Sequence, residues 1–124
     1  SYPQFGLDKL YFCSMSKEVE DKYREVLDKL GPVFGDGMEL MDVLFLVGIR
    51  ESGKAPTKMS KQEKEDAMHL GTCTILEQYG YYKSLGEDEE GWPQFEHLKD
   101  LPPMNEQEQE ALLKKGVADY FEKV

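Results

Sequence analysis

The side chains with the clearest chemical potential lie around His69. On a helix, Asp66 lies three residues before this histidine, and Glu65 and Cys73 lie four residues to either side, so all can share one face. Such a set can supply a general base, a nucleophile or metal ligands. It is short of ligands for a metal unless another helix contributes. We therefore expect a half-exposed surface histidine with a local carboxylate partner, with a metal site and a general base as alternatives.

A second pattern, Gly48-Ile-Arg-Glu-Ser-Gly53-Lys54-Ala55, differs by one residue from a phosphate-binding P-loop. In a P-loop, glycines let backbone N–H groups approach the phosphates, and the lysine meets their charge. Here Ala55 replaces the hydroxyl residue that would hold Mg²⁺, and Pro56 follows where the loop should enter a helix with free N–H donors. The pattern predicts a helix C-cap followed by an exposed loop, and not a nucleotide site.

A group of aromatic residues begins at Tyr79 and continues into the connector that runs from Gly80 to Pro103. Tyrosine and tryptophan combine apolar area with a polar group and are frequent in binding hot spots, but they also pin irregular loops to helices. Both interpretations stay open. The acidic run Glu87–Glu90 lacks the ligand spacing of an EF-hand and predicts a solvated loop tip. If the protein has a recognition surface, its predicted members are His69, Tyr79, Tyr81, Tyr82, Trp92 and Phe95.

These residues must be positioned by helices, because four stretches carry apolar residues at helical spacing. Ser16 is suited to cap the first stretch, which Gly31-Pro32 should stop. Ser60 with Glu63, and Asn105 with Glu108, have the spacing of capping boxes. Pro93 is suited to begin a short helix that buries Phe95 and Leu98. The expected fold is all-α, a compact bundle in one domain (residues 1–124), with main helices at about 16–31, 37–52, 60–80 and 105–123 and a short helix near 93–99.

The second of these stretches is apolar around most of its circumference. Such a helix is central in a domain or has a second face in an oligomer, so a homodimer through residues 37–52 is one expectation. The run Val43–Ile49 is also compatible with a buried strand, which would make the fold α+β. The length of the stretch and the cap-like Asp36 and Gly53 favour the helix.

Composition excludes several classes of function. The 124 residues carry a formal charge of −10, which repels nucleic acid phosphates. Much of that charge lies in residues 84–110, which hold nine acidic residues and one lysine. Two cysteines, Cys13 and Cys73, without metal-ligand spacing, and an N-terminal stretch without a leader pattern predict a cytoplasmic location. The seven-residue run Val43–Ile49 is too short to span a membrane.

No catalytic constellation is visible in the sequence, since no nucleophile is paired with a base at a recognisable spacing. We therefore expect a small helical interaction or adaptor module without catalysis, with a protein partner that is basic in charge, and no cofactor. The alternative is a small-ligand-binding or enzymatic protein, with a site near His69 and the segment Tyr79–Phe95. A concave pocket that brings the aromatic residues to His69 would favour this alternative.

Overall fold

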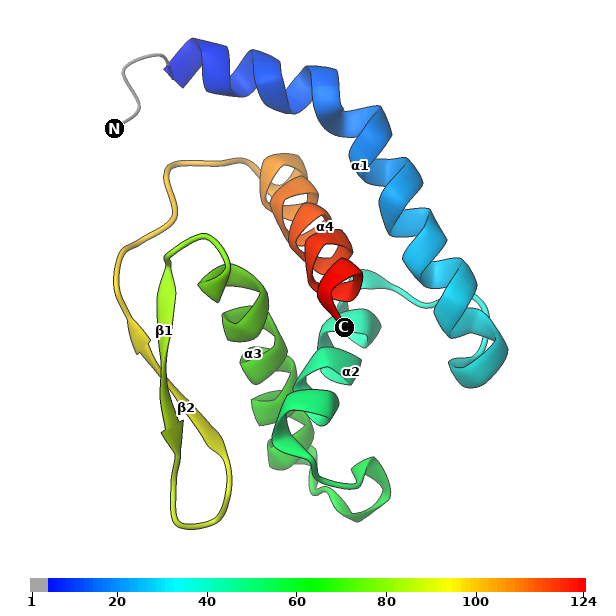
Figure 1. Cartoon of the computed structure of the whole chain (residues 1–124), viewed down its shortest axis with the longest axis vertical. Coiled ribbons are helices and arrows are strands. Elements are labelled where there is room, and N and C mark those ends of the chain that lie inside the picture. The colour runs from blue at the N-terminus through cyan, green and yellow to red at the C-terminus, as the bar shows by residue number, and fades with distance from the viewer. Residues whose placement is uncertain (1–4) are drawn as a thin grey trace. The chain divides into compact units, whose positions relative to one another are not determined.

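The computed structural model describes the backbone of residues 5–124 and the side chains from Lys17 onward. It contains two compact units. One is built from α1 (Phe5–Phe34) and α4 (Glu106–Lys123), and the other is the continuous segment Gly37–Pro102 (Figure 1). The continuous unit holds α2 (Leu40–Ser52), the 3₁₀ turn η1 (Pro56–Lys58), α3 (Lys61–Glu77), β1 (Tyr82–Glu87) and β2 (Pro93–His97). The prediction of one domain over residues 1–124 stays a prediction.

The four main helices are confirmed, and two of the predicted capping boxes are formed. At the start of α3, the Glu63 N–H donates to the Ser60 hydroxyl at 3.1 Å, and the Ser60 N–H donates to the Glu63 carboxylate at 2.9 Å. Asn105 and Glu108 do the same at the start of α4, at 2.8 and 3.1 Å. Each box satisfies backbone N–H groups that have no partner inside the helix.

Helix α2 covers the run Val43–Ile49, so the alternative of a strand there is wrong. The helix ends at Gly53, whose positive φ of 69° closes it, and its N–H donates to the Ile49 carbonyl at 3.0 Å. The P-loop-like pattern is therefore a helix end followed by η1, as predicted. Val43 and Val47 of α2 are fully buried, while Met41 is 63% exposed. The homodimer through residues 37–52 stays a prediction.

The first helix is longer than the predicted range of 16–31 at both ends. It begins at Phe5, so Ser16 lies inside the helix and does not cap it, and it continues through Pro32 to Phe34. A proline removes one backbone bond and crowds the carbonyl four residues before it. Near a C-terminus that cost is small, because few turns follow. The helix stops at Gly35, with φ 104°, whose N–H donates to Gly31 at 2.7 Å.

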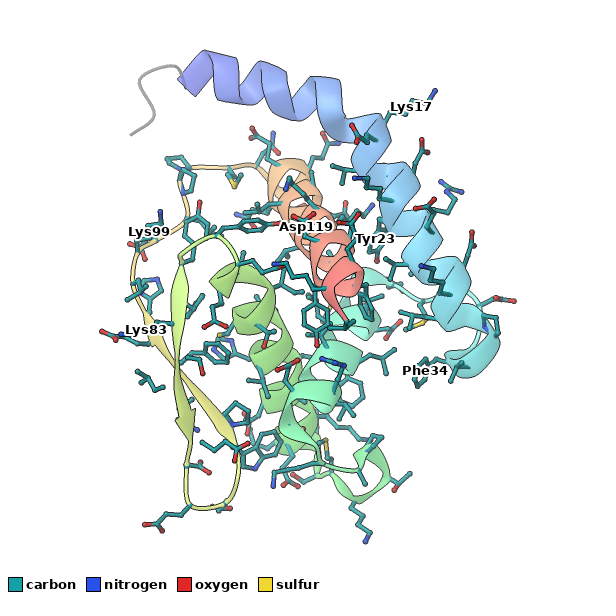
Figure 2. The ribbon with its side chains drawn as sticks, in the orientation of Figure 1. Lys17, Tyr23, Phe34, Lys83, Lys99 and Asp119 are labelled. Carbon is teal, nitrogen blue, oxygen red and sulfur yellow. The ribbon has the colours of Figure 1, made fainter. Side chains whose placement is uncertain are left out.

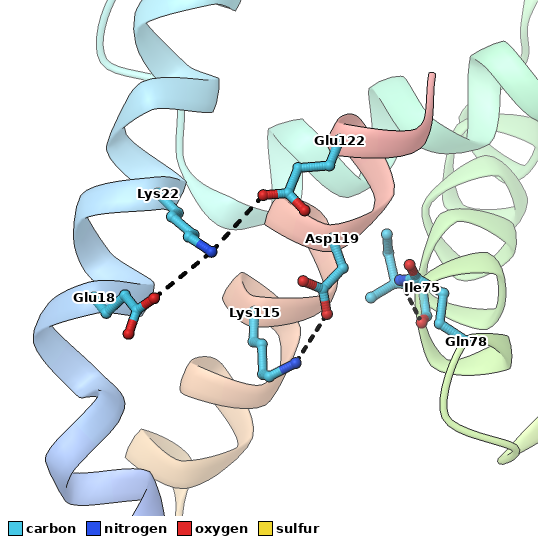
Figure 3. Close-up of polar contacts among 7 residues, drawn as sticks. All are labelled: Glu18, Lys22, Ile75, Gln78, Lys115, Asp119 and Glu122. Atoms are coloured by element: carbon cyan, nitrogen blue, oxygen red, sulfur yellow. Dashed lines mark hydrogen bonds and ion pairs between the residues drawn. The ribbon is translucent and has the colours of Figure 1, made fainter.

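In the unit formed by α1 and α4, ion pairs join the two helices. The Lys22 ammonium lies 3.7 Å from Glu18 on α1 and 3.8 Å from Glu122 on α4 (Figure 3). The Lys114 ammonium lies 2.8 Å from the Glu20 carboxylate and 5.2 Å from the centre of the Tyr23 ring. Exposed ion pairs of this kind contribute little free energy to the folded state. Within the described residues, no helix is both long enough and apolar enough to cross a membrane.

In the continuous unit, α2 and α3 approach each other at glycines. A Cβ atom placed on Gly71 of α3 would overlap the carbonyl oxygen of Leu44 on α2, and one on Gly48 of α2 would overlap the carbonyl oxygen of Ala67 on α3. The two backbones are therefore in direct contact, which only glycine permits at these two positions. The α3 backbone near its end is tightened by Gln78, whose side-chain amide donates to the Ile75 carbonyl at 3.0 Å (Figure 3).

The predicted short helix near residues 93–99 is wrong, because Pro93–His97 forms strand β2. It pairs antiparallel with β1, with Tyr82 opposite His97, Ser84 opposite Phe95 and a bulge between Ser84 and Gly86. Pro93 is tolerated because it is the first residue of its strand, where no N–H is needed for the ladder. Phe95 is half-buried as a strand residue, and Leu98, which the helix would have buried, is 50% exposed.

The hairpin lies beside α3 (Figure 1). At its foot, the Leu98 N–H donates to the Tyr81 carbonyl at 2.9 Å, and the Ser84 N–H donates to the Glu77 carboxylate at 2.9 Å. Lys83 points away from α3 into solvent (Figure 2). Since side chains alternate along a strand, its neighbour Tyr82 is directed to the opposite face.

Candidate functional site

The hairpin and α3 enclose an open cleft with a volume of about 530 Å³. The α3 side of the cleft is formed by one face of that helix, and the other side by the start of β1, the hairpin turn and β2. From α3 it is lined by Glu63, Asp66, His69, Leu70 and Cys73, and from the hairpin by Tyr82, Asp88, Glu90, Trp92, Pro93, Gln94 and Phe95.

Four of the six predicted site residues meet in this cleft. His69, Tyr82, Trp92 and Phe95 line it together, although up to 26 positions of sequence separate them. His69 itself is exposed and borders the cleft, while the three aromatic residues are half-buried. The Tyr82 and Phe95 rings meet edge to face, with centroids 6.5 Å apart. The cleft is thus a concave pocket that brings aromatic residues to His69, which is the feature expected of a ligand-binding site.

The remaining two predicted residues do not line the cleft. Tyr81 is buried at the foot of the hairpin, with the Lys99 ammonium 4.9 Å from the centre of its ring. Tyr79 lies in the turn after α3, where its N–H donates to the Leu76 carbonyl at 3.1 Å. For Tyr81, pinning of the connector is therefore the better interpretation. Of the two acidic neighbours predicted for His69, Asp66 lines the cleft and Glu65 does not.

The lining of the cleft is acidic. Four of its residues carry carboxylates, namely Glu63, Asp66, Asp88 and Glu90, and none of its described residues is a lysine or arginine. A cleft walled by one sign of charge focuses its field and attracts ligands of the opposite sign. Aromatic faces add to this, because they attract cations through their quadrupole. The lining therefore favours a positively charged ligand.

The thiol in the cleft is not an activated nucleophile. The Cys73 sulfur lies 3.5 Å from Nε2 of His69, one helical turn away. Burial raises the pKa of the Cys73 thiol to about 11, against a smaller lowering effect of its hydrogen bond with the Tyr82 hydroxyl. Burial, and then the charge of an ionised Cys73, also raise the pKa of Tyr82 above its ordinary value. Both groups are therefore protonated near neutral pH, and a thiol attacks only as a thiolate.

The residues that could hold a metal do not gather in this cleft or elsewhere in the described part of the chain. Among the side chains from Lys17 onward, no three His, Cys, Asp or Glu residues are grouped so that they could bind one ion. Nε2 of His97, the second histidine, lies 3.2 Å from the Asp100 carboxylate, and the centroid of its ring lies 5.3 Å from that of Tyr82.

The hairpin turn that forms the end of the cleft is organised by Asp88. One of its carboxylate oxygens accepts the N–H groups of Glu90 and Trp92, at 2.9 and 3.0 Å, and the other accepts the Gln94 amide at 3.2 Å. Gly91, with φ 84°, supplies the left-handed residue that the turn requires. The predicted solvated tip at Glu87–Glu90 is exposed, but its sequence does not reveal that Asp88 organises the turn.

We expect Asp88→Ala to accelerate hydrogen exchange of the Glu90 and Trp92 amides about fivefold, because each loses an acceptor worth about 1 kcal/mol. Asp88→Asn keeps a side-chain oxygen at the same place and is the matched control, with exchange within about threefold of the parent. The measurement is amide exchange followed by NMR. Equal acceleration in both variants would contradict this explanation of the turn.

Lys54 lies outside the cleft but contacts two residues that line it, whereas its sequence pattern predicts only an exposed loop. Its ammonium donates to the Glu90 carbonyl at 2.8 Å and lies 5.1 Å from the centre of the Trp92 ring. The lysine of the P-loop-like pattern thus contacts the tip of a hairpin 36 residues later in the chain. No local sequence signal could have placed it there, since the contact depends on the register of the hairpin.

No family model, no curated protein sequence and no solved structure matches this chain.

Proposed function

We propose that the protein is a non-catalytic interaction module that binds a positively charged segment of a protein partner in the cleft between α3 and the β1–β2 hairpin. The observation that carries the proposal is the lining of the cleft, in which four carboxylate residues surround Tyr82, Trp92 and Phe95 without a lysine or arginine among the described residues. A lysine or arginine side chain matches both parts of that lining, because its charge pairs with carboxylates and its stem packs on aromatic rings.

A volume of about 530 Å³ suits one or two long side chains and a short stretch of backbone. The cleft is open, which suits a segment of a larger chain better than a ligand that must be enclosed. The protonated thiol of Cys73 supports binding over catalysis. A cytoplasmic location, where thiols stay reduced, remains a prediction from the two cysteines.

The test uses Trp92, the single tryptophan of the chain, as a fluorescent reporter in the cleft. We expect a blocked tetralysine peptide to change its emission saturably at low salt, and the affinity to fall as salt is raised, because exposed charges are screened. A blocked tetraglutamate peptide is the matched ligand control and should leave the emission unchanged. Absence of saturation with tetralysine would contradict the proposal.

The paired variant Glu63→Gln/Asp66→Asn should weaken tetralysine binding about tenfold, since each lost pair is worth up to about 1 kcal/mol. Glutamine at position 63 preserves the capping box of α3. The control is Asp21→Asn/Glu110→Gln, which removes the same charge from exposed positions on α1 and α4. Equal weakening by both pairs would show that net charge, and not the cleft, attracts the peptide.

A small organic cation is the other occupant that the lining admits, and spermidine is its probe. Saturation by spermidine together with no response to tetralysine would overturn the protein partner and support the small-ligand alternative in the same cleft. Saturation by tetralysine with a weak response to spermidine supports the proposed module.

A further inference from the structure

The tip of the hairpin is the part of the cleft with the least support from the strands. A two-stranded hairpin is marginally stable by itself, and residues 88–90 at the tip are exposed. At the foot, the Leu98 N–H donates to the Tyr81 carbonyl, and the Ser84 N–H donates to the Glu77 carboxylate. The tip lies at the opposite end of the strands, so its position depends on what it contacts there.

Lys54 supplies a contact at that end. Its ammonium makes the 2.8 Å bond to the Glu90 carbonyl, and a Cβ placed on Gly91 would lie 3.8 Å from the same ammonium. It also lies over the Trp92 ring, 5.1 Å from its centre. One charged group therefore contacts Glu90 and Trp92 and lies close to Gly91 between them, and these three residues lead from the turn into β2.

The backbone that carries Lys54 is itself well held. The Lys54 N–H donates to the Ser52 hydroxyl at 3.2 Å, and that hydroxyl donates to the Ile49 carbonyl at 3.2 Å. The left-handed Gly53 closes α2 immediately before it. The backbone of Lys54 is therefore held at the end of α2, and its ammonium connects that helix end to the hairpin tip.

Lys54 does not line the cleft, although Trp92 does. The ammonium therefore supports the indole from outside the cleft, while the ring still borders its interior. Aromatic faces hold cations by an attraction that grows when water is excluded, and a half-buried indole meets that condition in part.

We infer that Lys54 is a positioning residue for the cleft, which holds the hairpin tip and the Trp92 ring in the arrangement that binds the cationic ligand. The inference rests on the proposed function for the ligand, but the positioning itself does not. It makes the affinity of an acidic site depend on a positive charge that lies outside it. Preorganisation of this kind raises affinity because the tip need not be ordered when the ligand arrives.

The variant Lys54→Met removes the charge and keeps the length of the side chain, and Lys54→Arg restores a charged donor. Lys58→Met is the matched control, since it removes the same charge from an exposed position in η1. Without ligand, we expect Lys54→Met to shift Trp92 emission to longer wavelength and to accelerate exchange of the Gly91 and Trp92 amides at least about threefold. Amides in α3 should not change, and Lys54→Arg should restore the parent values.

With the tetralysine peptide, Lys54→Met should bind about three- to tenfold more weakly, and Lys54→Arg within about twofold of the parent. The direction of the change in affinity distinguishes the two explanations, because loss of a positive charge near an acidic cleft would by itself strengthen binding of a cation. Tighter binding by Lys54→Met would overturn the inference and make Lys54 a competitor of the ligand. Unchanged emission and exchange would also overturn it. If the parent protein does not bind tetralysine, the proposed function fails while the emission and exchange data still decide the positioning.

Discussion

Replacing Gly71 by alanine is expected to destabilise the protein by about 3 kcal/mol or more, the largest effect of any single methyl group we foresee. The added Cβ would overlap the Leu44 carbonyl oxygen, and its next neighbours are the Leu44 carbonyl carbon at 2.8 Å and the Gly48 nitrogen at 3.2 Å. These are backbone atoms in the middle of α2, so they cannot rotate away as a side chain would. Helix α2 must move as a whole, and the contact between α2 and α3 opens.

The direction of this effect is the reverse of what helix propensity predicts. Alanine in a helix interior is favoured over glycine by about 1 kcal/mol. Thermal unfolding followed by circular dichroism measures the balance, and a loss of about 3 kcal/mol corresponds to a fall of about 10 °C in a chain of this size. Gly48→Ala should have a similar effect, because its Cβ would overlap the Ala67 carbonyl.

Gly31→Ala is the matched control for this experiment. Position 31 is also a helical glycine, but its Cβ would meet only the end of the Asp36 side chain, at 2.8 Å, which can rotate away. We expect its melting temperature to stay the same or rise. Unchanged stability of Gly71→Ala would show that α2 and α3 are farther apart than described.

Cys73 is expected to react with iodoacetamide about 100-fold more slowly in the native protein than in the unfolded chain at pH 8. Burial raises its pKa from 9.0 to about 11. At a pH below 9, each unit by which the pKa rises lowers the thiolate fraction about tenfold. In the native protein the rate should still rise tenfold per pH unit up to about pH 10. In the unfolded chain the same rise should level off near pH 9.

The measurement needs a Cys13→Ser variant so that a single thiol reports, with alkylation followed by mass spectrometry. Tyr82→Phe is the control, since it removes the hydroxyl contact that lowers the pKa while the burial remains, and the native rate should stay slow. A native rate at pH 8 as fast as that of the unfolded chain would indicate an activated thiolate, and would return nucleophilic chemistry to the candidate functions of the cleft.

The helices could be predicted from the sequence because their signals are local. The box of Ser60 with Glu63 and that of Asn105 with Glu108 involve residues three apart, and the structure forms both. The end of the first helix could not be predicted from the Gly31-Pro32 pair. A proline disfavours a helix because it lacks an N–H group and crowds the carbonyl four residues before it. Here α1 continues through Pro32 and ends at Gly35 instead.

The hairpin was missed because its signals are spread over two strands. Pro93 suits the first residue of a helix and equally the first residue of a strand, so it does not distinguish them. The informative features are the turn formed by Asp88 and Gly91 and the alternation of residues 93–97, which gain meaning only once β1 is available as a partner. Pairing between strands is a non-local interaction, which residue spacing within one segment does not reveal.

The candidate site was predictable in its residue types and only partly in its members. Trp92 and Phe95 could be singled out because aromatic residues in a polar connector need a surface to cover. Their meeting with His69 depends on how the hairpin folds back on α3. Tyr81 and Tyr82 are adjacent in sequence, yet one is buried at the foot of the hairpin and the other lines the cleft. The strand geometry decides between them.

The order of the two units along the chain has a consequence for synthesis. Every residue of the cleft lies within Gly37–Pro102, so a growing chain can assemble the cleft before α4 has been made. Helix α1 is made before the continuous unit, and α4, with which it pairs, is made after that unit. The apolar residues Val19, Tyr23 and Val26 of α1, which are buried in the folded protein, therefore lack α4 until the continuous unit has been made, and transiently exposed apolar surface of this kind favours aggregation.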